Sequence, residues 1–422
     1  MKVVLINKSD STGGAAVVTC RLMEALRSAG IDARMLVTEK LTDSPYVETA
    51  ASKSMIMRSF LVERLKIFMK NGFDRSTLFK IDTASDGLPL HRHPLVKESD
   101  VVCLNWVNQG MLSLREIERI SALGKPVVWT MHDMWNFTGI CHHAGGCGKF
   151  RDICHDCFLL GKRAASNDLS TKTMKRKKQL YSSKGITFVA VSNWLAALAR
   201  QSSLLSGMRT EVIPNAFPLP LNVSLRESVP NGSETTGKPV TLVFGAARLD
   251  DPIKGLPILV EATRILKEKY PDEAERMELV TFGNVRNPAA FDGIALRHRH
   301  LGIINGADRI RDIYLHGDIV VSTSLYETLP GTLVEGQAYG CVPVSFSRGG
   351  QSDIITHRET GWLCDFNEES LQANAGAIAE GIIWAAHAPE DTRRKMLSNV
   401  ISRFSAESVA KRYIALFSSL LG

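Results

Sequence analysis

Short runs rich in valine, isoleucine and other apolar residues recur along this chain, separated by segments long enough to form helices. In the first half the runs are residues 2–7, 33–38, 100–105, 126–131, 186–192 and 211–215; in the second half they are 239–247, 277–283, 318–324 and 342–347. Such runs are typical of strands buried on both faces, and strands that alternate with helices form parallel sheets with crossover helices. The pattern therefore predicts an α/β protein in which this arrangement occurs twice.

The length of the chain also favours two domains, because 422 residues exceed the roughly 250–300 at which one hydrophobic core stops growing. We predict two Rossmann-like domains whose parallel sheets face each other across a cleft. The expected parts are a first domain at 1–217, a linker poor in apolar residues at 218–238, a second domain at 239–403, and a C-terminal helix at 404–422 that crosses back to the first domain. Further helices are expected at 17–30, 255–270 and 331–340.

The composition is that of a soluble globular protein, with 44% hydrophobic and 23% charged residues and no apolar window long enough to span a bilayer. We expect a cytoplasmic protein. The net charge of +7 favours anionic partners, which could be phosphorylated substrates, an acidic membrane surface or nucleic acid. The densest basic run, Lys175 to Lys178, is most simply a solvated helix face. No aromatic residues interleave with it, so we expect no nucleic-acid partner.

Charged residues of the second half lie where a parallel sheet binds its ligands, at the carboxyl ends of strands. Arg248 and Lys254 follow one strand, and two cations in one cleft suit a diphosphate. Glu327 precedes the helix expected at 331–340, and Glu335 lies inside it. A helix start suits a phosphate and a carboxylate suits ribose hydroxyls, so the whole arrangement indicates a nucleotide-sugar site. Each residue alone could equally be a surface charge.

Several features together resemble one family. They are the Glu327 and Glu335 pair, Arg248 and Lys254 after a strand, Gly13 and Gly14 after the first strand, the segment 125–150 and the closing segment 403–421. In order and spacing they look like the family-four retaining glycosyltransferases of the GT-B fold, over nearly the whole chain. The segment 125–150 is similar to a subgroup found among bacterial capsule and exopolysaccharide transferases. After the asparagine of 213–217, many relatives have a glycine that this chain lacks, which affects the expected hinge.

The resemblance implies transfer of a hexosyl group from a nucleotide sugar, with a UDP-sugar expected, to a glycan or lipid-linked acceptor. It implies that Arg248 and Lys254 hold the donor diphosphate, that Glu327 contacts the transferred sugar and that Glu335 contacts the ribose. His132 matches the histidine near the reacting centre, although it could also be a core histidine. The implied donor-binding residues are Gly13, Gly14, Arg248, Lys254, Glu327, Leu329, Pro330, Gly331, Thr332 and Glu335.

The resemblance further implies retention of anomeric configuration without a catalytic cofactor. The sequence has no obvious carboxylate nucleophile, which favours front-face substitution, and nothing resembles the paired aspartates that would hold a divalent metal.

Half of the eight cysteines fall within 17 residues, at Cys141, Cys147, Cys154 and Cys157. Their spacing, with glycines and histidines between them, suits a structural zinc site in a reducing compartment. Free thiols and disulfides remain alternatives. The other four cysteines lie among apolar neighbours and are most simply buried small side chains.

The segment 55–73 has an apolar stripe at helical spacing, bordered by cations. The stripe is Met55, Phe60, Leu61, Leu65, Phe68 and Met69, and the cations are Arg58, Arg64, Lys66 and Lys70. Such a helix either packs its stripe into the domain core or lies in an anionic membrane interface. In the second case the protein would be peripheral at the inner face of the cytoplasmic membrane, with Lys175 to Lys178 adding attraction.

Two other classes of function remain open at this stage. A nucleotide-sugar epimerase could share the two-domain fold and the uridine diphosphate site, but it would need no acceptor. A zinc-centred nucleic-acid-binding protein is the alternative that is not an enzyme, and its binding would weaken with salt.

Overall fold

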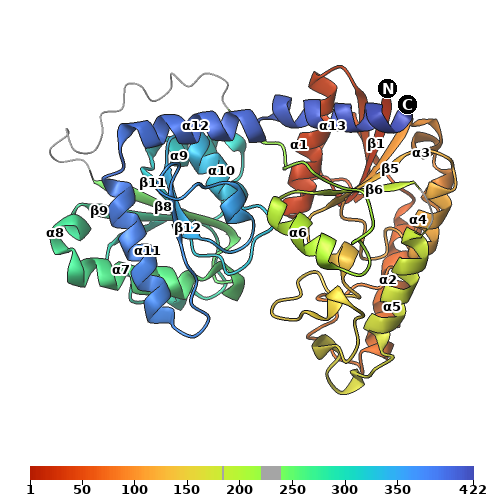
Figure 1. The fold of residues 1–422 in the computed structure, drawn as a ribbon, viewed down its shortest axis with the longest axis horizontal. Helices are drawn as coiled ribbons and strands as arrows, with labels where there is room; N and C mark the ends of the chain where they lie inside the picture. Colours follow the sequence, from red (N-terminus) through yellow and green to blue (C-terminus); the bar gives the residue numbers. More distant parts are fainter. Residues whose placement is uncertain (183–184, 220–238) are drawn as a thin grey trace. The chain divides into compact units, whose positions relative to one another are not determined.

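The computed structural model describes residues 1–182, 185–219 and 239–422. These residues form two compact units, one from Met1–Ala216 with Val409–Gly422 and the other from Phe217–Ser408. Each unit has a parallel sheet covered by helices, so the predicted α/β fold with two parallel sheets is confirmed (Figure 1). The predicted linker at 218–238 lies, apart from its first two residues, outside the described residues.

The first unit is built on a seven-stranded sheet in the order β3-β2-β1-β4-β5-β6-β7. Its strands are β1 (Lys2–Ser9), β2 (Asp32–Glu39), β3 (Val47–Thr49), β4 (Val101–Leu104), β5 (Val127–Met131), β6 (Ile186–Ala190) and β7 (Thr210–Val212). Strands β4, β5 and β6 are buried along their whole length, as expected for strands with helices on both faces. The strand order reverses between β1 and β4, and this reversal marks where a doubly wound sheet binds its ligand.

The helices of the first unit are α1 (Gly14–Ser28), α2 (Lys53–Lys70), α3 (Pro94–Glu98), α4 (Leu114–Ser121), α5 (Leu169–Tyr181) and α6 (Asn193–Gln201). The helix predicted at 17–30 begins earlier, at Gly14, and ends at Ser28. Its end is set by Gly30, whose φ of 84° is readily adopted by glycine.

The second unit is built on a six-stranded sheet in the order β10-β9-β8-β11-β12-β13. Its strands are β8 (Val240–Arg248), β9 (Met277–Asn284), β10 (Arg297–His300), β11 (Ile319–Ser322), β12 (Val342–Phe346) and β13 (Trp362–Cys364). Its helices are α7 (Leu256–Lys269), α8 (Pro271–Glu275), α9 (Ala307–His316), α10 (Gly331–Ala338), α11 (Leu371–Ala386) and α12 (Glu390–Phe404). Here the strand order reverses between β8 and β11.

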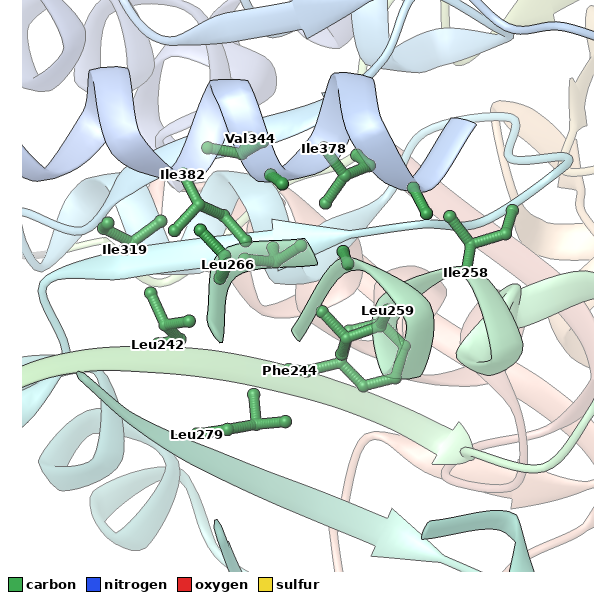
Figure 2. Close-up of a cluster of buried hydrophobic side chains, with 14 of the residues drawn as sticks. Leu242, Phe244, Ile258, Leu259, Leu266, Leu279, Ile319, Val344, Ile378 and Ile382 are labelled. Atoms are coloured by element: carbon green, nitrogen blue, oxygen red, sulfur yellow. The ribbon is translucent and has the colours of Figure 1, made fainter. Parts of the chain in front are cut away.

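The core of the second unit lies between its sheet and the helices α7 and α11. Figure 2 shows Leu242 and Phe244 of β8 facing Leu259 of α7, with Ile378 and Ile382 of α11 closing the layer. Close-packed apolar layers of this kind resist deformation. The core therefore fixes the carboxyl ends of β8 and β11, where the predicted donor residues lie.

The helix expected at 404–422 is α13, which follows directly on the last helix of the second unit. Helix α12 ends at Phe404, Ser405 is extended, and α13 (Ala406–Leu421) follows. Most of α13 groups with the first unit, where the Tyr413 hydroxyl lies 3.0 Å from the hydroxyl of Thr130 on β5. Among the helices of the described residues, none combines the length and the apolar character needed to cross a bilayer.

Candidate active site

A pocket of about 400 Å³ lies at the reversal of strand order in the first unit. The end of β1 contributes Lys8, the start of α1 contributes Gly14, and the loops after β4 and β5 contribute Trp106 and His132. The pocket thus brings together Gly13, Gly14 and His132, which the sequence placed in one site. Its polar groups and one indole ring are the kinds of groups that hold a sugar or a phosphate.

Gly13 and Gly14 allow close approach to this pocket for different reasons. Gly13 precedes α1 with a φ of 88°, a conformation that strains other residues. Gly14 has no such φ, and a Cβ added there would meet no atom within 4 Å. The backbone does not require glycine at position 14, so its lack of a side chain leaves space in the pocket.

His132 is a neutral ring that points its Nε2 toward Asn105. Its Nε2 lies 3.1 Å from Asn105 Oδ1, which can only accept, so the ring proton is assigned to Nε2. Burial lowers the pKa of His132 to about 4, although the neighbouring Asp133 carboxylate opposes the shift. At neutral pH this side chain can exchange hydrogen bonds with a substrate without carrying charge.

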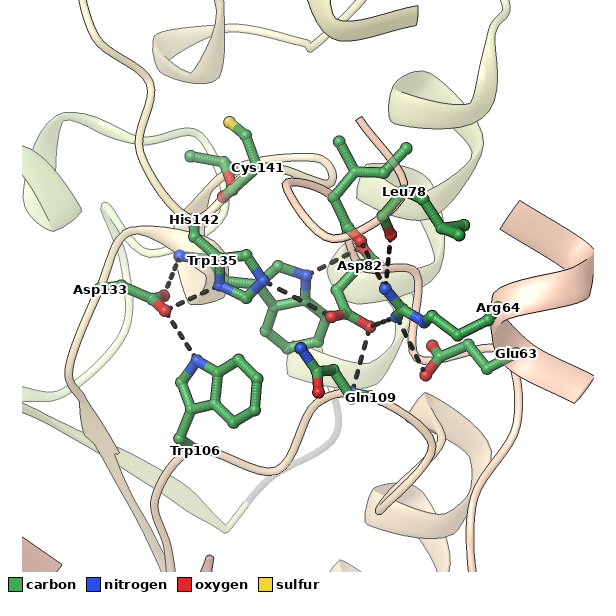
Figure 3. A network of polar contacts seen from close by, with 12 residues as sticks. Glu63, Arg64, Leu78, Asp82, Trp106, Gln109, Asp133, Trp135, Cys141 and His142 are labelled. Atoms are coloured by element: carbon green, nitrogen blue, oxygen red, sulfur yellow. Dashed lines mark hydrogen bonds and ion pairs between the residues drawn. The ribbon is translucent and has the colours of Figure 1, made fainter. Parts of the chain in front are cut away.

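A buried polar network backs the pocket (Figure 3). The indole Nε1 of Trp106 donates to Asp133 Oδ2 at 2.9 Å, and Nδ1 of His142 lies 2.7 Å from the same oxygen. On its other side, Nε2 of His142 lies 3.5 Å from Asp82, which accepts from Arg64 of α2 at 2.7 Å. Carboxylates therefore face both nitrogens of His142.

The ion pairs of this network determine which of its side chains are charged. Burial would lower the pKa of His142, but the charge of Asp133, the hydrogen bond to Asp133 and the charge of Asp82 raise it to about 10. Burial would likewise raise the pKa of Asp133, but the His142 charge and hydrogen bond lower it to about 2. The imidazolium and its two carboxylates thus hold Trp106 in place at the pocket wall.

In the second unit, the predicted donor residues meet at the carboxyl ends of β8 and β11. Lys254 Nζ lies 2.5 Å from Glu327 Oε1. This ion pair joins the turn after β8 to the turn after β11. Arg248, the last residue of β8, pairs with Asp250 at 3.3 Å and Asp251 at 3.6 Å. Both cations are held by carboxylates and remain partly exposed, so an anionic ligand can reach them.

The backbone around Lys254 is fixed by the residue that follows it. Gly255 has a φ of 65°, and a Cβ there would lie 2.1 Å from the carbonyl oxygen of Thr323. The Thr323 hydroxyl in turn donates to the carbonyl of Lys254 at 3.0 Å. Only glycine fits at 255, and this close contact ties Lys254 to the end of β11.

The remaining predicted donor residues surround the start of α10. Pro330 is its N-cap residue and no side chain caps the helix. Leu329 and Pro330 are buried, Gly331, Thr332 and Glu335 are half-buried, and Glu335 lies in the second turn of α10. Helix starts favour anions because their first N–H groups have no partner within the helix.

The four clustered cysteines are free thiols in a loop of the first unit. Burial raises the pKa of Cys141 to about 12 and that of Cys154 to about 11. Throughout the described ranges, no three His, Cys, Asp or Glu side chains lie together in an arrangement that could hold a metal ion. The structure does not gather the predicted ligands into a zinc site, and zinc binding by this loop stays a prediction from the spacing alone.

Sequence reasoning missed most of the polar residues around the first pocket. Asp133 adjoins His132, and the apolar strand before it could have identified both as strand-end residues. Lys8 could have been identified in the same way, because it follows the apolar run of β1. Asp82 and His142 carried no such signal, because they lie in irregular segments whose pairing is visible only in three dimensions.

Comparison with known proteins finds similarity to glycosyltransferases. Residues 228–403 match the family model described as "Glycosyl transferases group 1". The chain has the GT-B fold and resembles glycosyltransferases of this group. It is 22% identical to the colanic acid biosynthesis glycosyl transferase WcaC of Escherichia coli (strain K12), with all of both chains covered. It is 24% identical to the amylovoran biosynthesis glycosyltransferase AmsK of Erwinia amylovora, over 47% of this chain and 49% of that one.

Among solved structures, the chain is similar to Anabaena Alr3699/HepE in complex with UDP and glucose. The TM-score is 0.61 at 16% identity, with 99% of this chain and 100% of the other covered. At this level of identity the structural similarity shows a shared fold and no more, and this fold agrees with the GT-B fold predicted from the sequence.

Gly14→Ala tests whether the space beside α1 belongs to a binding site. We expect the melting temperature to stay the same or rise slightly, because alanine is favoured over glycine in helices. We expect KM to rise for the substrate that enters the pocket, because the added methyl group fills part of it. Gly207→Ala is the matched control, since that glycine also has open space but does not line the pocket. Equal KM values in both variants would contradict this assignment.

His132 should stay neutral far below the usual histidine range. The folded pKa of about 4 lies below the unfolded value of about 6.5, so the stability that this group contributes is present above pH 6.5 and is lost as the pH falls toward 4. NMR of ¹⁵N-histidine-labelled protein can follow the ring, with the resonance assigned by its loss in His132→Asn. A titration midpoint near 6.5 would show that the ring is open to water.

Proposed function

We propose that this enzyme transfers a hexosyl group from a UDP-sugar, with retention of anomeric configuration, to a glycan or lipid-linked acceptor in the assembly of a bacterial exopolysaccharide or capsule. The observation that carries the proposal is the joining of Lys254 to Glu327 across the reversal of strand order in the second unit, with Arg248 at the end of β8. The relatives named for colanic acid and amylovoran support the pathway class, and the Anabaena complex with UDP supports the nucleotide.

The chemistry of the leaving group falls to the second unit. As the sugar departs, negative charge grows on the diphosphate, and Arg248, Lys254 and the start of α10 can neutralise it. Preorganised charges of this kind stabilise a transition state without further rearrangement. Glu335 is proposed to accept hydrogen bonds from the ribose hydroxyls, which persist through the reaction.

Glu327 has two roles in this proposal. Its ion pair orients the Lys254 ammonium in the free enzyme, and its other oxygen can contact the transferred sugar. The acceptor is proposed to attack from the face that the diphosphate leaves, which accounts for retention without a covalent enzyme intermediate. The neutral His132 and Trp106 in the first unit suit a sugar acceptor, because an imidazole and an indole offer hydrogen bonds and a flat apolar face.

Donor binding and transfer test the proposal directly. A UDP-sugar at about 100 times its Kd should increase the free energy of unfolding by about 2.7 kcal/mol. A thermal-shift screen that compares it with guanosine and cytidine diphosphate sugars would detect this stabilisation. Arg248→Ala and Lys254→Ala should each lower turnover by on the order of 100-fold or more. A larger shift with a guanosine diphosphate sugar would change the assigned nucleotide, and normal turnover in both variants would remove these cations from the site.

The two glutamates should separate kinetically. Glu327→Gln should lower kcat, because it weakens the orientation of Lys254, whereas Glu335→Gln should mainly raise the KM for the donor. Glu327→Gln and Lys254→Ala should be strongly non-additive in the double variant, because the residues act as one pair. Additive effects, or an exchange of the two kinetic patterns, would show that the roles are assigned wrongly.

A further inference from the structure

Helix α2 of the first unit turns its apolar side chains outward. Met57, Leu61, Leu65 and Met69 are spaced by four residues, lie on one side of the helix and are 56%, 54%, 55% and 48% exposed. Residues spaced by four form a continuous stripe on a helix surface. Of the stripe expected at 55–73, Met55, Leu61, Leu65 and Met69 are exposed, and Phe60 and Phe68 are half-buried. Of its two alternatives, packing of the whole stripe into the core is therefore not what the structure shows.

The inward side of α2 is mostly polar. Its buried residues are Ser59, Glu63, Arg64 and Ile67. Arg64 donates to Asp82 at 2.7 Å and to the carbonyl of Leu78 at 2.7 Å, and the Ser59 hydroxyl donates to the carbonyl of Gly110 at 2.7 Å. These buried bonds would be lost if α2 rotated, so the apolar stripe is held toward solvent.

Exposed aromatic side chains extend the stripe beyond α2. Phe73 and Phe79, in the segment that follows the helix, are 61% and 57% exposed. The ring of Phe73 lies 5.3 Å from that of Phe68 on α2. We name this surface the docking face and define it as Met55, Met57, Leu61, Leu65, Met69, Phe73 and Phe79.

The charges around the docking face have one predominant sign. Exposed cations in and just after α2 are Lys53, Arg58, Lys70, Arg75 and Lys80. In the same segment the acidic residues are the buried Glu63 and the half-buried Asp74. The surface therefore suits a partner that is both apolar and anionic.

The docking face begins beside the pocket of the first unit. The Nζ atom of Lys8, which lines the pocket, lies 5.3 Å from the centre of the Phe60 ring on α2. Phe60 in turn stacks on Phe79 at a ring distance of 6.5 Å. A surface that seats on the docking face therefore lies close to the pocket.

We propose that the docking face binds the interface of an anionic lipid bilayer. Long Leu, Met and Phe side chains flanked by Lys and Arg are typical of helices that lie in the headgroup region, where apolar groups enter the lipid and cations remain with the phosphates. A second copy of the chain fits less well, because a two-fold interface on this face would bring its cations against like charges.

Lys175 to Lys178 do not contribute as a run to membrane binding, because Lys177 is buried and donates to the carbonyl of Thr138 at 3.1 Å.

Vesicle sedimentation of the full chain tests this inference. We expect pelleting with phosphatidylcholine vesicles that contain phosphatidylglycerol at low salt, and weaker pelleting in high salt or with phosphatidylcholine alone. The double variant Leu61→Gln/Leu65→Gln should lower the partition coefficient by on the order of tenfold or more. The control Leu41→Gln/Leu371→Gln changes residues that are 64% and 47% exposed elsewhere and should bind as the wild type does.

Three outcomes would overturn the inference. They are absence of lipid-dependent pelleting at low salt, equal binding by the two double variants, and a concentration-dependent dimer that the Leu61→Gln/Leu65→Gln change abolishes while vesicles bind nothing. Melting temperatures establish that both variants fold, since all four side chains are exposed. The inference does not rest on the proposed activity: a thermal shift with the UDP-sugar tests the donor site in the same samples, so either result can fail alone.

Discussion

Arg64 on α2 and Asp82 form an ion pair of 2.7 Å inside the first unit, and much of the unit's polar architecture continues from it. The carboxylate of Asp82 also faces His142, and the other nitrogen of His142 reaches Asp133. Removing charges from water is unfavourable unless they are paired and hydrogen-bonded, so each of these groups depends on the next. Loss of one member would leave a buried charge without its partner, which typically costs about 3–5 kcal/mol.

This network has consequences at both of its ends. At one end it fixes Asp133, whose carboxylate accepts from Trp106 and from the backbone N–H of Trp135 at 2.8 Å, so the pocket wall has one arrangement. At the other end Arg64 and Glu63 occupy the inward side of α2, which leaves the apolar side of that helix without a core to enter. One set of buried charges thus accounts for a rigid pocket and for an exposed apolar surface next to it.

The parts of this structure that the sequence predicts are those governed by local patterns. The strands β1, β2, β4, β5, β6, β7, β8, β9, β11 and β12 fall on the predicted runs, and the helix start at Gly331 follows from Pro330. Arg248, Lys254 and Glu327 could be grouped because each follows a strand, and strand ends meet at one edge of a parallel sheet. The orientation of α2 could not be predicted, because its apolar stripe fits either a core or a surface. The pairing of Arg64 with Asp82, between residues 18 positions apart, decides between them.

The burial of Lys177 on α5 also could not be predicted from the sequence. In the sequence it belongs to a basic run that is most simply solvated, yet it is buried, with its ammonium over the Trp135 ring at 3.4 Å from the ring centre. Burial lowers its pKa to about 7, and the charges of the Asp133 and Asp82 carboxylates oppose this shift. Basic residues therefore lie in different environments on two helices of one unit. On α5 a lysine is buried against carbonyl groups and an indole ring. On α2 the cations that flank the apolar stripe are exposed to solvent. Net charge alone cannot distinguish these cases, because the difference lies in which polar groups the fold places beneath each helix.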